Sequence, residues 1–181
     1  MFINITCGLV IIGSCAGILL YLGLSPALVM ATMILCGIAN GAGRLIFPLL
    51  SDWWFSGPNT KRAWIWLIIA ALELAASLFC YLVSPAAFPV VAILINATYG
   101  AAFATLPSVL ENHYGKSCLS QIHGFCLTSW GMASLAAYLI TVCLFAIAVP
   151  SMPVLFCLLS IGYALNCIFA AQAIMHKRLK N

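Results

Sequence analysis

Charge is what this sequence most lacks. Only 6% of its 181 residues are charged, whereas 65% are hydrophobic. A soluble domain carries roughly 25% charged residues, which help to cover its surface in water. Because this chain cannot present such a surface, its composition excludes an ordinary soluble domain and predicts an integral membrane protein.

Charged side chains are also too few for several classes of function. The seven basic residues form no basic face, so no nucleic-acid partner is expected. The three acids are widely spaced, and the chain contains no GxSxG, HExxH or phosphate-binding glycine loop. We therefore expect no enzymatic activity, no metal site and no cofactor.

Cysteine pairs at metal-binding spacing are absent as well. The chain has nine cysteines, but none belongs to a CxxC pair and most lie within apolar runs. Such cysteines behave as small hydrophobic side chains in helices. The pattern favours this role over disulfide bonds or metal ligation.

Long apolar runs, in contrast, are abundant. A helix needs about 20 apolar residues to cross the hydrocarbon core. Six runs reach this length, at about 2–22, 27–50, 63–83, 88–110, 120–148 and 152–175. Prolines mark several of the joints between them. The sequence predicts an all-α, polytopic membrane protein in which residues 1–181 form a single six-helix transmembrane domain.

Basic residues appear at every second joint. The joints 23–26, 84–87 and 149–151 contain no charged residue, whereas 51–62, 111–119 and the C-terminal tail contain lysine or arginine. Cytoplasmic loops of membrane proteins are enriched in these residues. The alternation predicts that both termini are cytoplasmic.

Glu73 lies midway along the third apolar run, where a charged side chain costs about 2.5–3.5 kcal/mol to insert. Helical spacing places four further residues on its face: Trp66, Ala70, Ser77 and Cys80. We expect this face to point into the bundle. Glu73 is then either a protonation site or cation partner, or a neutral acid whose hydrogen bonds only pack helices. The sequence leaves both roles open.

Arg44 lies within the second apolar run, about two turns from its centre. Gly37, Asn40 and Gly41 precede it at helical spacing and complete a stripe of small and polar residues. Such a stripe admits a ligand, and a guanidinium binds a carboxylate through two hydrogen bonds. We favour Arg44 and Asn40 as substrate-binding residues over an arginine that only extends to the interface.

Trp130 and Tyr138 lie on one stripe of the fifth run, which begins at His123 and includes Ser134 and Thr141. Such a stripe either lines a pathway or makes ordinary helix contacts. In the first case, Trp130 and Tyr138 shape the substrate cavity.

The second run ends in a more specific pattern, Asn40-Gly-Ala-Gly-Arg44-Leu-Ile-Phe-Pro-Leu-Leu-Ser51-Asp52. It resembles the segment of major facilitator superfamily transporters that leads into their cytoplasmic loop motif. A second stretch, from Tyr99 to Gly131, is similar to the fourth and fifth helices of one half of such a transporter. Within the superfamily, the pattern looks like the oxalate/formate antiporters and the monocarboxylate porters.

This resemblance is to the second half of such a transporter. It implies one six-helix half of a bundle in which two repeats surround a site near the membrane midplane. It also implies that Ser51 and Asp52 belong to the cytoplasmic loop motif. Two departures weaken that assignment, since Pro48 replaces the usual glycine and Trp53 follows Asp52 directly.

The resemblance further implies a secondary transporter for a small organic anion in a bacterial inner membrane. Arg44 would bind the carboxylate, and Glu73 would carry a proton or balance charge. Trp130 stands where the oxalate carriers have a lysine, so the second positive charge is missing. A monocarboxylate such as formate or pyruvate is therefore expected rather than a dicarboxylate.

A lone six-helix half exposes a face that a partner would cover. We expect a homodimer or a separately encoded six-helix half, surrounded by membrane lipid. The alternative is a non-transporting membrane subunit or a truncated remnant of such a carrier, because the first run begins directly after Met1.

Overall fold

The protein folds into six long helices. The computed structural model describes residues 1–55, 62–146 and 152–178. The helices are α1 (Phe2–Tyr21), α2 (Pro26–Trp54), α3 (Ala63–Leu82), α4 (Phe88–Tyr114), α5 (Leu119–Ala146) and α6 (Met152–Arg178), with short 3-10 helices η1 (Pro85–Ala87) and η2 (Lys116–Cys118). Within the described ranges the protein is all-α, without a strand. Six of its helices are long and apolar enough to cross a membrane.

Three helices continue beyond the apolar runs that predict them. α2 ends at Trp54 and α4 at Tyr114, each four residues later than expected from the sequence, and α6 ends at Arg178, three residues later. α2 and α4 contain an internal proline, Pro48 and Pro107. A proline removes one backbone donor, but helices in a membrane tolerate this where neighbouring groups satisfy the backbone. Neither proline therefore ends its helix.

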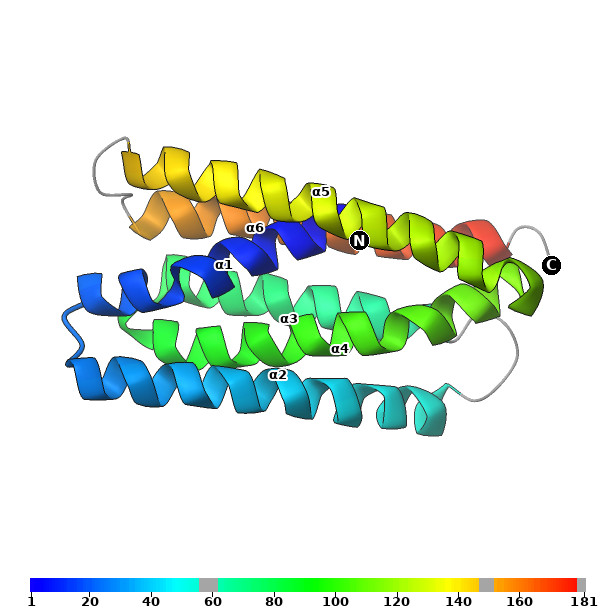
Figure 1. Ribbon diagram of the computed structural model, residues 1–181, viewed down its shortest axis with the longest axis horizontal. Coiled ribbons are helices and arrows are strands. Elements are labelled where there is room, and N and C mark those ends of the chain that lie inside the picture. The colour runs from blue at the N-terminus through cyan, green and yellow to red at the C-terminus, as the bar shows by residue number, and fades with distance from the viewer. Residues whose placement is uncertain (56–61, 147–151, 179–181) are drawn as a thin grey trace.

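A short turn reverses the chain between α1 and α2. Gly23 has a φ of 81°, in the left-handed region that favours glycine. The Ser25 side chain then caps α2 by accepting a hydrogen bond from the Leu28 N–H at 3.4 Å, and Pro26 begins the helix. Successive helices of the bundle run antiparallel (Figure 1).

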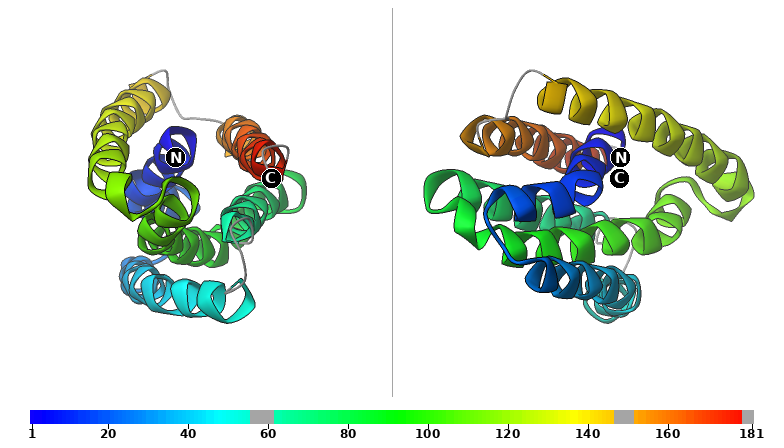
Figure 2. Two further views of the ribbon diagram at one scale, coloured as in Figure 1. Left: turned by 90° about the vertical axis from the view of Figure 1, so that its right-hand side faces the viewer. Right: turned by 60° about the vertical axis from the view of Figure 1, so that its left-hand side comes forward.

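α1 and α4 lie at the centre of the bundle. α1 packs against α2, α4, α5 and α6, whereas α4 packs against α1, α2, α3 and α5. Seen end-on in Figure 2, α3 and α6 lie side by side on one flank, while α5 and α2 lie apart at the upper and lower edges. Consequently α1 and α4 are largely buried, and α2 and α5 are largely exposed.

α2 and α4 approach each other most closely at two glycines. A Cβ on Gly43 would overlap the backbone carbonyl of Ala97, and a Cβ on Gly100 would overlap the carbonyl of Asn40. Small residues allow membrane helices to pack backbone against backbone. This contact fixes the middle of α2, and with it Arg44, against the middle of α4.

Four described charged side chains, Asp52, Arg62, Glu111 and Lys116, gather at one end of the bundle, on the right in Figure 1. The described joints at the other end, 22–25 and 83–87, carry no charge. The excess of basic residues in cytoplasmic loops predicts that the charged end faces the cytoplasm.

Candidate functional site

Arg44 lies near the middle of α2. Asn40 is the central residue of this helix, so Arg44 lies about 6 Å beyond the midpoint at a rise of 1.5 Å per residue. The Arg44 Nε donates a hydrogen bond to the Asn40 Oδ1 at 3.1 Å. Neither of the two ion pairs among the described residues involves Arg44. The guanidinium therefore keeps its terminal nitrogens available to a ligand.

The stripe that contains Arg44 is open. Gly37, Gly41 and Arg44 are exposed and Asn40 is half-buried. No atom of a neighbouring segment lies within 4 Å of a Cβ built on Gly37 or Gly41. A charged side chain at this depth normally faces the bundle interior or a water-filled cavity rather than lipid. An open stripe with an unpaired guanidinium is suited to binding an anion.

Three aromatic side chains on α4 and α5 lie next to this stripe. The Trp130 Nε1 donates a hydrogen bond to the Tyr99 hydroxyl at 3.2 Å. The ring of Phe103 lies 5.2 Å from that of Tyr99 and 6.1 Å from that of Trp130, centroid to centroid. Arg44 lies within electrostatic range of the Tyr99 hydroxyl. Tyr99 therefore connects two residues predicted for the site, Arg44 and Trp130.

Tyr138 does not join this aromatic group. It lies about two turns beyond Trp130 on α5, and its side chain is 65% exposed. Among the described residues it makes no side-chain hydrogen bond and no ring contact. The structure thus separates the two aromatic residues that the sequence assigns to the cavity wall.

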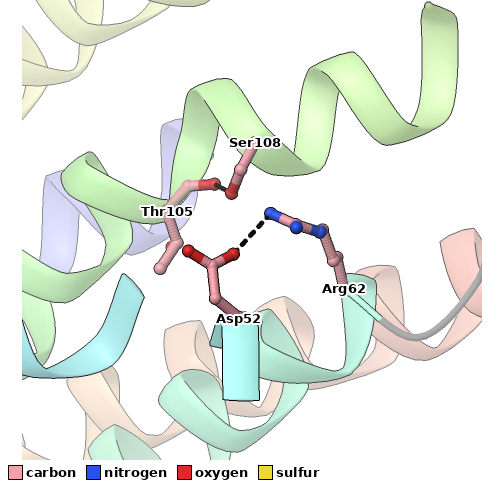
Figure 3. Close-up of polar contacts among 4 residues, drawn as sticks. All are labelled: Asp52, Arg62, Thr105 and Ser108. Atoms are coloured by element: carbon pink, nitrogen blue, oxygen red, sulfur yellow. Dashed lines mark hydrogen bonds and ion pairs between the residues drawn. The ribbon is translucent and has the colours of Figure 1, made fainter. Parts of the chain in front are cut away.

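The two residues of the predicted loop motif lie at the charged end of α2. Arg62 Nη1 pairs with the Asp52 Oδ1 at 2.8 Å, and Figure 3 shows this pair beside Ser108 of α4. Arg62, Ser108 and Glu111 help to line a cleft of about 440 Å³ there. Ser51 is buried, and its hydroxyl has no hydrogen-bond partner in the described structure. The ion pair joins the end of α2 to the start of α3, and Asp52 lies about 12 Å along α2 from Arg44.

Glu73 forms a second polar site, inside the bundle. Its side chain is fully buried, and the Asn4 Nδ2 on α1 donates a hydrogen bond to its Oε2. The hydroxyl of Thr98 on α4 lies beside the carboxyl group. The predicted inward face of α3 is indeed buried at Ala70, Ser77 and Cys80.

Side chains of α6 close this second site. Tyr163 is fully buried within electrostatic range of Glu73. One turn before it, Ser160 donates a hydrogen bond to the Ser77 hydroxyl on α3 at 3.0 Å. Glu73 therefore lies where α1, α3, α4 and α6 meet.

α1 and α4 contact both polar sites. On α1, Asn4 binds Glu73, while Gly8 lies against Tyr99 so closely that a Cβ there would lie 2.7 Å from the ring. On α4, Thr98 faces Glu73 and the next residue, Tyr99, faces the aromatic group. A movement of either helix must change both sites.

The sequence singled out Arg44, Asn40 and Glu73, but it did not assign partners to them. Asn4 was missed, although it is a polar residue in an apolar run, which is the signal that identifies Glu73. Tyr99 was noted only as part of a family resemblance. Arg62, the partner of Asp52, was noted only for its charge.

Comparison with known proteins adds no assignment. No protein-family model matches the chain, and no curated protein matches it significantly. Within the described residues, no three His, Cys, Asp or Glu side chains converge to hold a metal ion. The functional argument therefore rests on the geometry of the two polar sites.

Proposed function

We propose that this chain is a six-helix unit of a secondary transporter, which moves a small organic anion across a membrane by alternating access. The observation that carries the proposal is Arg44. It is an exposed guanidinium that forms no ion pair within the part of the chain that the structure describes, close to the middle of a helix of membrane-spanning length. A carboxylate is the ligand whose two oxygens match the planar donors of a guanidinium.

The surroundings of Arg44 favour a small monocarboxylate such as formate or pyruvate. Every other lysine and arginine of the chain lies in a joint, in the last turn of α6 or after it, so one positive charge is available at mid-membrane depth. Asn40 orients the guanidinium, and Trp130 with Tyr99 forms an aromatic wall beside it. A dicarboxylate would leave its second charge unpaired, which is costly in a poorly solvated site.

The helix packing supports a major-facilitator-type half-bundle. The two three-helix segments, α1–α3 and α4–α6, make equivalent contacts. α2 packs against α4 as α5 packs against α1, and α3 packs against α4 as α6 packs against α1. Successive helices alternate in direction and each repeat has three of them. Corresponding helices of the two repeats therefore run in opposite directions. Nested inverted three-helix repeats of this kind occur within each half of major facilitator transporters.

The transporter needs a second bundle to complete its cavity. α2 and α5 are the most exposed helices, and Arg44 and Trp130 lie on them. Such carriers place the substrate between two six-helix repeats near the membrane midplane. We propose a second copy of this chain or a separately encoded six-helix half as the partner, in a bacterial inner membrane with both termini cytoplasmic.

The alternative is a non-transporting membrane subunit or a remnant of such a carrier. The same exposure of α2 and α5 favours it, because a unit with an open cavity cannot alternate access by itself. The two possibilities differ in whether the isolated chain transports.

Uptake of labelled formate, pyruvate and oxalate into proteoliposomes tests the proposal, with Arg44→Gln as the variant and Lys116→Gln as the control. We expect saturable uptake of a monocarboxylate, reduced about tenfold or more in Arg44→Gln, because a hydrogen-bonded charge contributes about 1.5–3 kcal/mol. Lys116→Gln removes only an exposed ion pair with Glu111 and should retain uptake.

Three results would change the conclusion. Unchanged uptake in Arg44→Gln would remove Arg44 from the site. A preference for oxalate would contradict the monocarboxylate assignment. Absence of uptake by the wild-type chain would favour the subunit or remnant over a self-sufficient carrier.

A further inference from the structure

Two oxygen atoms in the Glu73 site have no hydrogen-bond partner among the described residues. They are Glu73 Oε1 and Asn4 Oδ1, and both are buried. They belong to side chains that are already joined, since Asn4 Nδ2 donates to Glu73 Oε2. Buried polar atoms in native proteins are nearly always satisfied, so two orphan acceptors on one bonded pair require an explanation.

One proton satisfies both atoms. A carboxylic acid carries one O–H donor, whereas a carboxylate carries none. If Glu73 is protonated on Oε1, this O–H can donate to Asn4 Oδ1 while Asn4 Nδ2 donates to Glu73 Oε2. The planar acid and the planar amide then form a cyclic pair with two hydrogen bonds between α3 and α1.

An ionised Glu73 would have weaker support than the acid has in this pair. The titratable groups within electrostatic range among the described residues are the Met1 amino group and Cys7 on the α1 side, and Tyr163 and Cys167 on α6. The Asn4 amide and the Thr98 hydroxyl on α4 favour the carboxylate as hydrogen-bond donors, and the Met1 amino group attracts it, but no described residue forms an ion pair with Glu73. Burial of an unpaired carboxylate is strongly unfavourable, so such groups take up a proton instead.

We propose that Asn4 and Glu73 form a proton-binding site between α1 and α3. The Glu73 carboxylate takes one proton from water, becomes a neutral acid and closes the cyclic pair with Asn4. Release of the proton to water opens one of the two hydrogen bonds and leaves a charge that must be hydrated. The reaction is a protonation alone and requires no other reactant.

The site is placed to couple protonation to the aromatic group beside Arg44. Asn4 and Gly8 lie one turn apart on α1, and Gly8 packs against Tyr99. When the carboxylate is formed and hydrated, α1 must separate from α3, and the packing of Tyr99 changes with it. This consequence rests on the proposed transport function, and it makes H⁺ the ion that moves with the organic anion.

The protonation state can be measured directly because the chain has only two glutamates, Glu73 and Glu111. Glu111→Gln leaves the site intact and makes Glu73 the single glutamate of the chain. Carbon-13 NMR of a sample labelled at the glutamate side-chain carboxyl should then show a protonated acid at neutral pH. Asn4→Leu, in the same background, should shift this resonance. A carboxylate resonance at neutral pH would overturn the proposal.

A second measurement separates a coupling role from a purely structural one. Proteoliposomes that contain a pH-sensitive dye should acidify inside while pyruvate enters. Glu73→Gln reproduces both hydrogen bonds with Asn4 but cannot release a proton, so it should retain pyruvate exchange and lose the acidification. Acidification that persists in this variant would refute H⁺ coupling through Glu73.

The two experiments fail independently. A protonated Glu73 in a chain that transports nothing would leave the proton site standing and remove the transport function. An ionised Glu73 in a chain that transports pyruvate would remove the proton site and leave the transport function standing.

Discussion

Two polar sites lie within this apolar bundle, and they differ in exposure and in the partner of their charged group. The Arg44 site is exposed on a peripheral helix, and its charged group forms no ion pair with any described acidic residue. The Glu73 site is fully enclosed by four helices, and its acid is bound to Asn4. An open cation is suited to an anionic ligand that arrives from water, whereas an enclosed acid is suited to a proton.

The comparison also shows how the two sites are connected. Both contact α1 and α4, the two central helices, through residues that are adjacent or one turn apart. A ligand at one site therefore has a physical route to bias the other. Breaking each site separately tests whether the two have the roles assigned to them.

The largest effect on stability is expected where α2 meets α4. This contact also positions Arg44. A Cβ on Gly43 would overlap the Ala97 carbonyl, and backbone cannot move away as a side chain can. Gly43→Ala should therefore destabilise the folded bundle by about 3 kcal/mol, at the upper end of overpacking costs. Thermal unfolding in detergent measures the change.

Gly41→Ala is the matched control, since a Cβ at Gly41 meets no atom within 4 Å. It lies on the same helix and adds the same methyl group. Equal stability of the two variants would show that the close contact between α2 and α4 does not hold the bundle together.

A smaller difference in stability should distinguish substitutions of Asn4 in the Glu73 site from substitutions of Asn40 in the Arg44 site. Asn4→Leu leaves a buried carboxyl group without its donor and should lower the free energy of unfolding by about 1–3 kcal/mol. Asn40→Leu removes a partner from an exposed guanidinium and should change stability by less than about 0.5 kcal/mol. Similar losses in both variants, measured by thermal unfolding, would contradict the contrast between an enclosed and an open site.

The smallest effect on uptake is expected at the edge of the Arg44 site. Trp130→Phe keeps an aromatic ring but removes the hydrogen bond to the Tyr99 hydroxyl. Loss of one neutral hydrogen bond corresponds to about 1 kcal/mol, so the KM for the anion should rise about fivefold. Uptake kinetics measure it, and an unchanged KM would place Trp130 outside the binding site.

The fold could be predicted from the sequence largely because the bilayer imposes one strong rule. Each helix needs a long apolar run, and the six runs match the six helices to within a few residues at most described ends. The ends of α2 and α4 were each placed four residues too early, because both helices continue past their apolar runs into more polar residues, 51–54 and 111–114.

The sites were only partly predictable, for a different physical reason. Helical spacing gives the residues that share a face, which is how Asn40 was joined to Arg44 and Ser77 to Glu73. It does not give the rotation of one helix against another when the helix is apolar on all sides. The Asn4–Glu73 pair spans 69 positions and depends on that rotation.

The most direct test of the account is whether the Arg44 stripe faces water and substrate. A cysteine introduced by Gly41→Cys should react with a membrane-impermeant thiol reagent, and pyruvate should slow the reaction. Ile46→Cys, on the opposite side of α2 from Arg44 and nearer its charged end, should not react. Peptide mass spectrometry distinguishes these positions from the native cysteines. A Gly41→Cys that is as unreactive as Ile46→Cys would show that the stripe faces lipid, and would contradict the assignment of Arg44 to a substrate site.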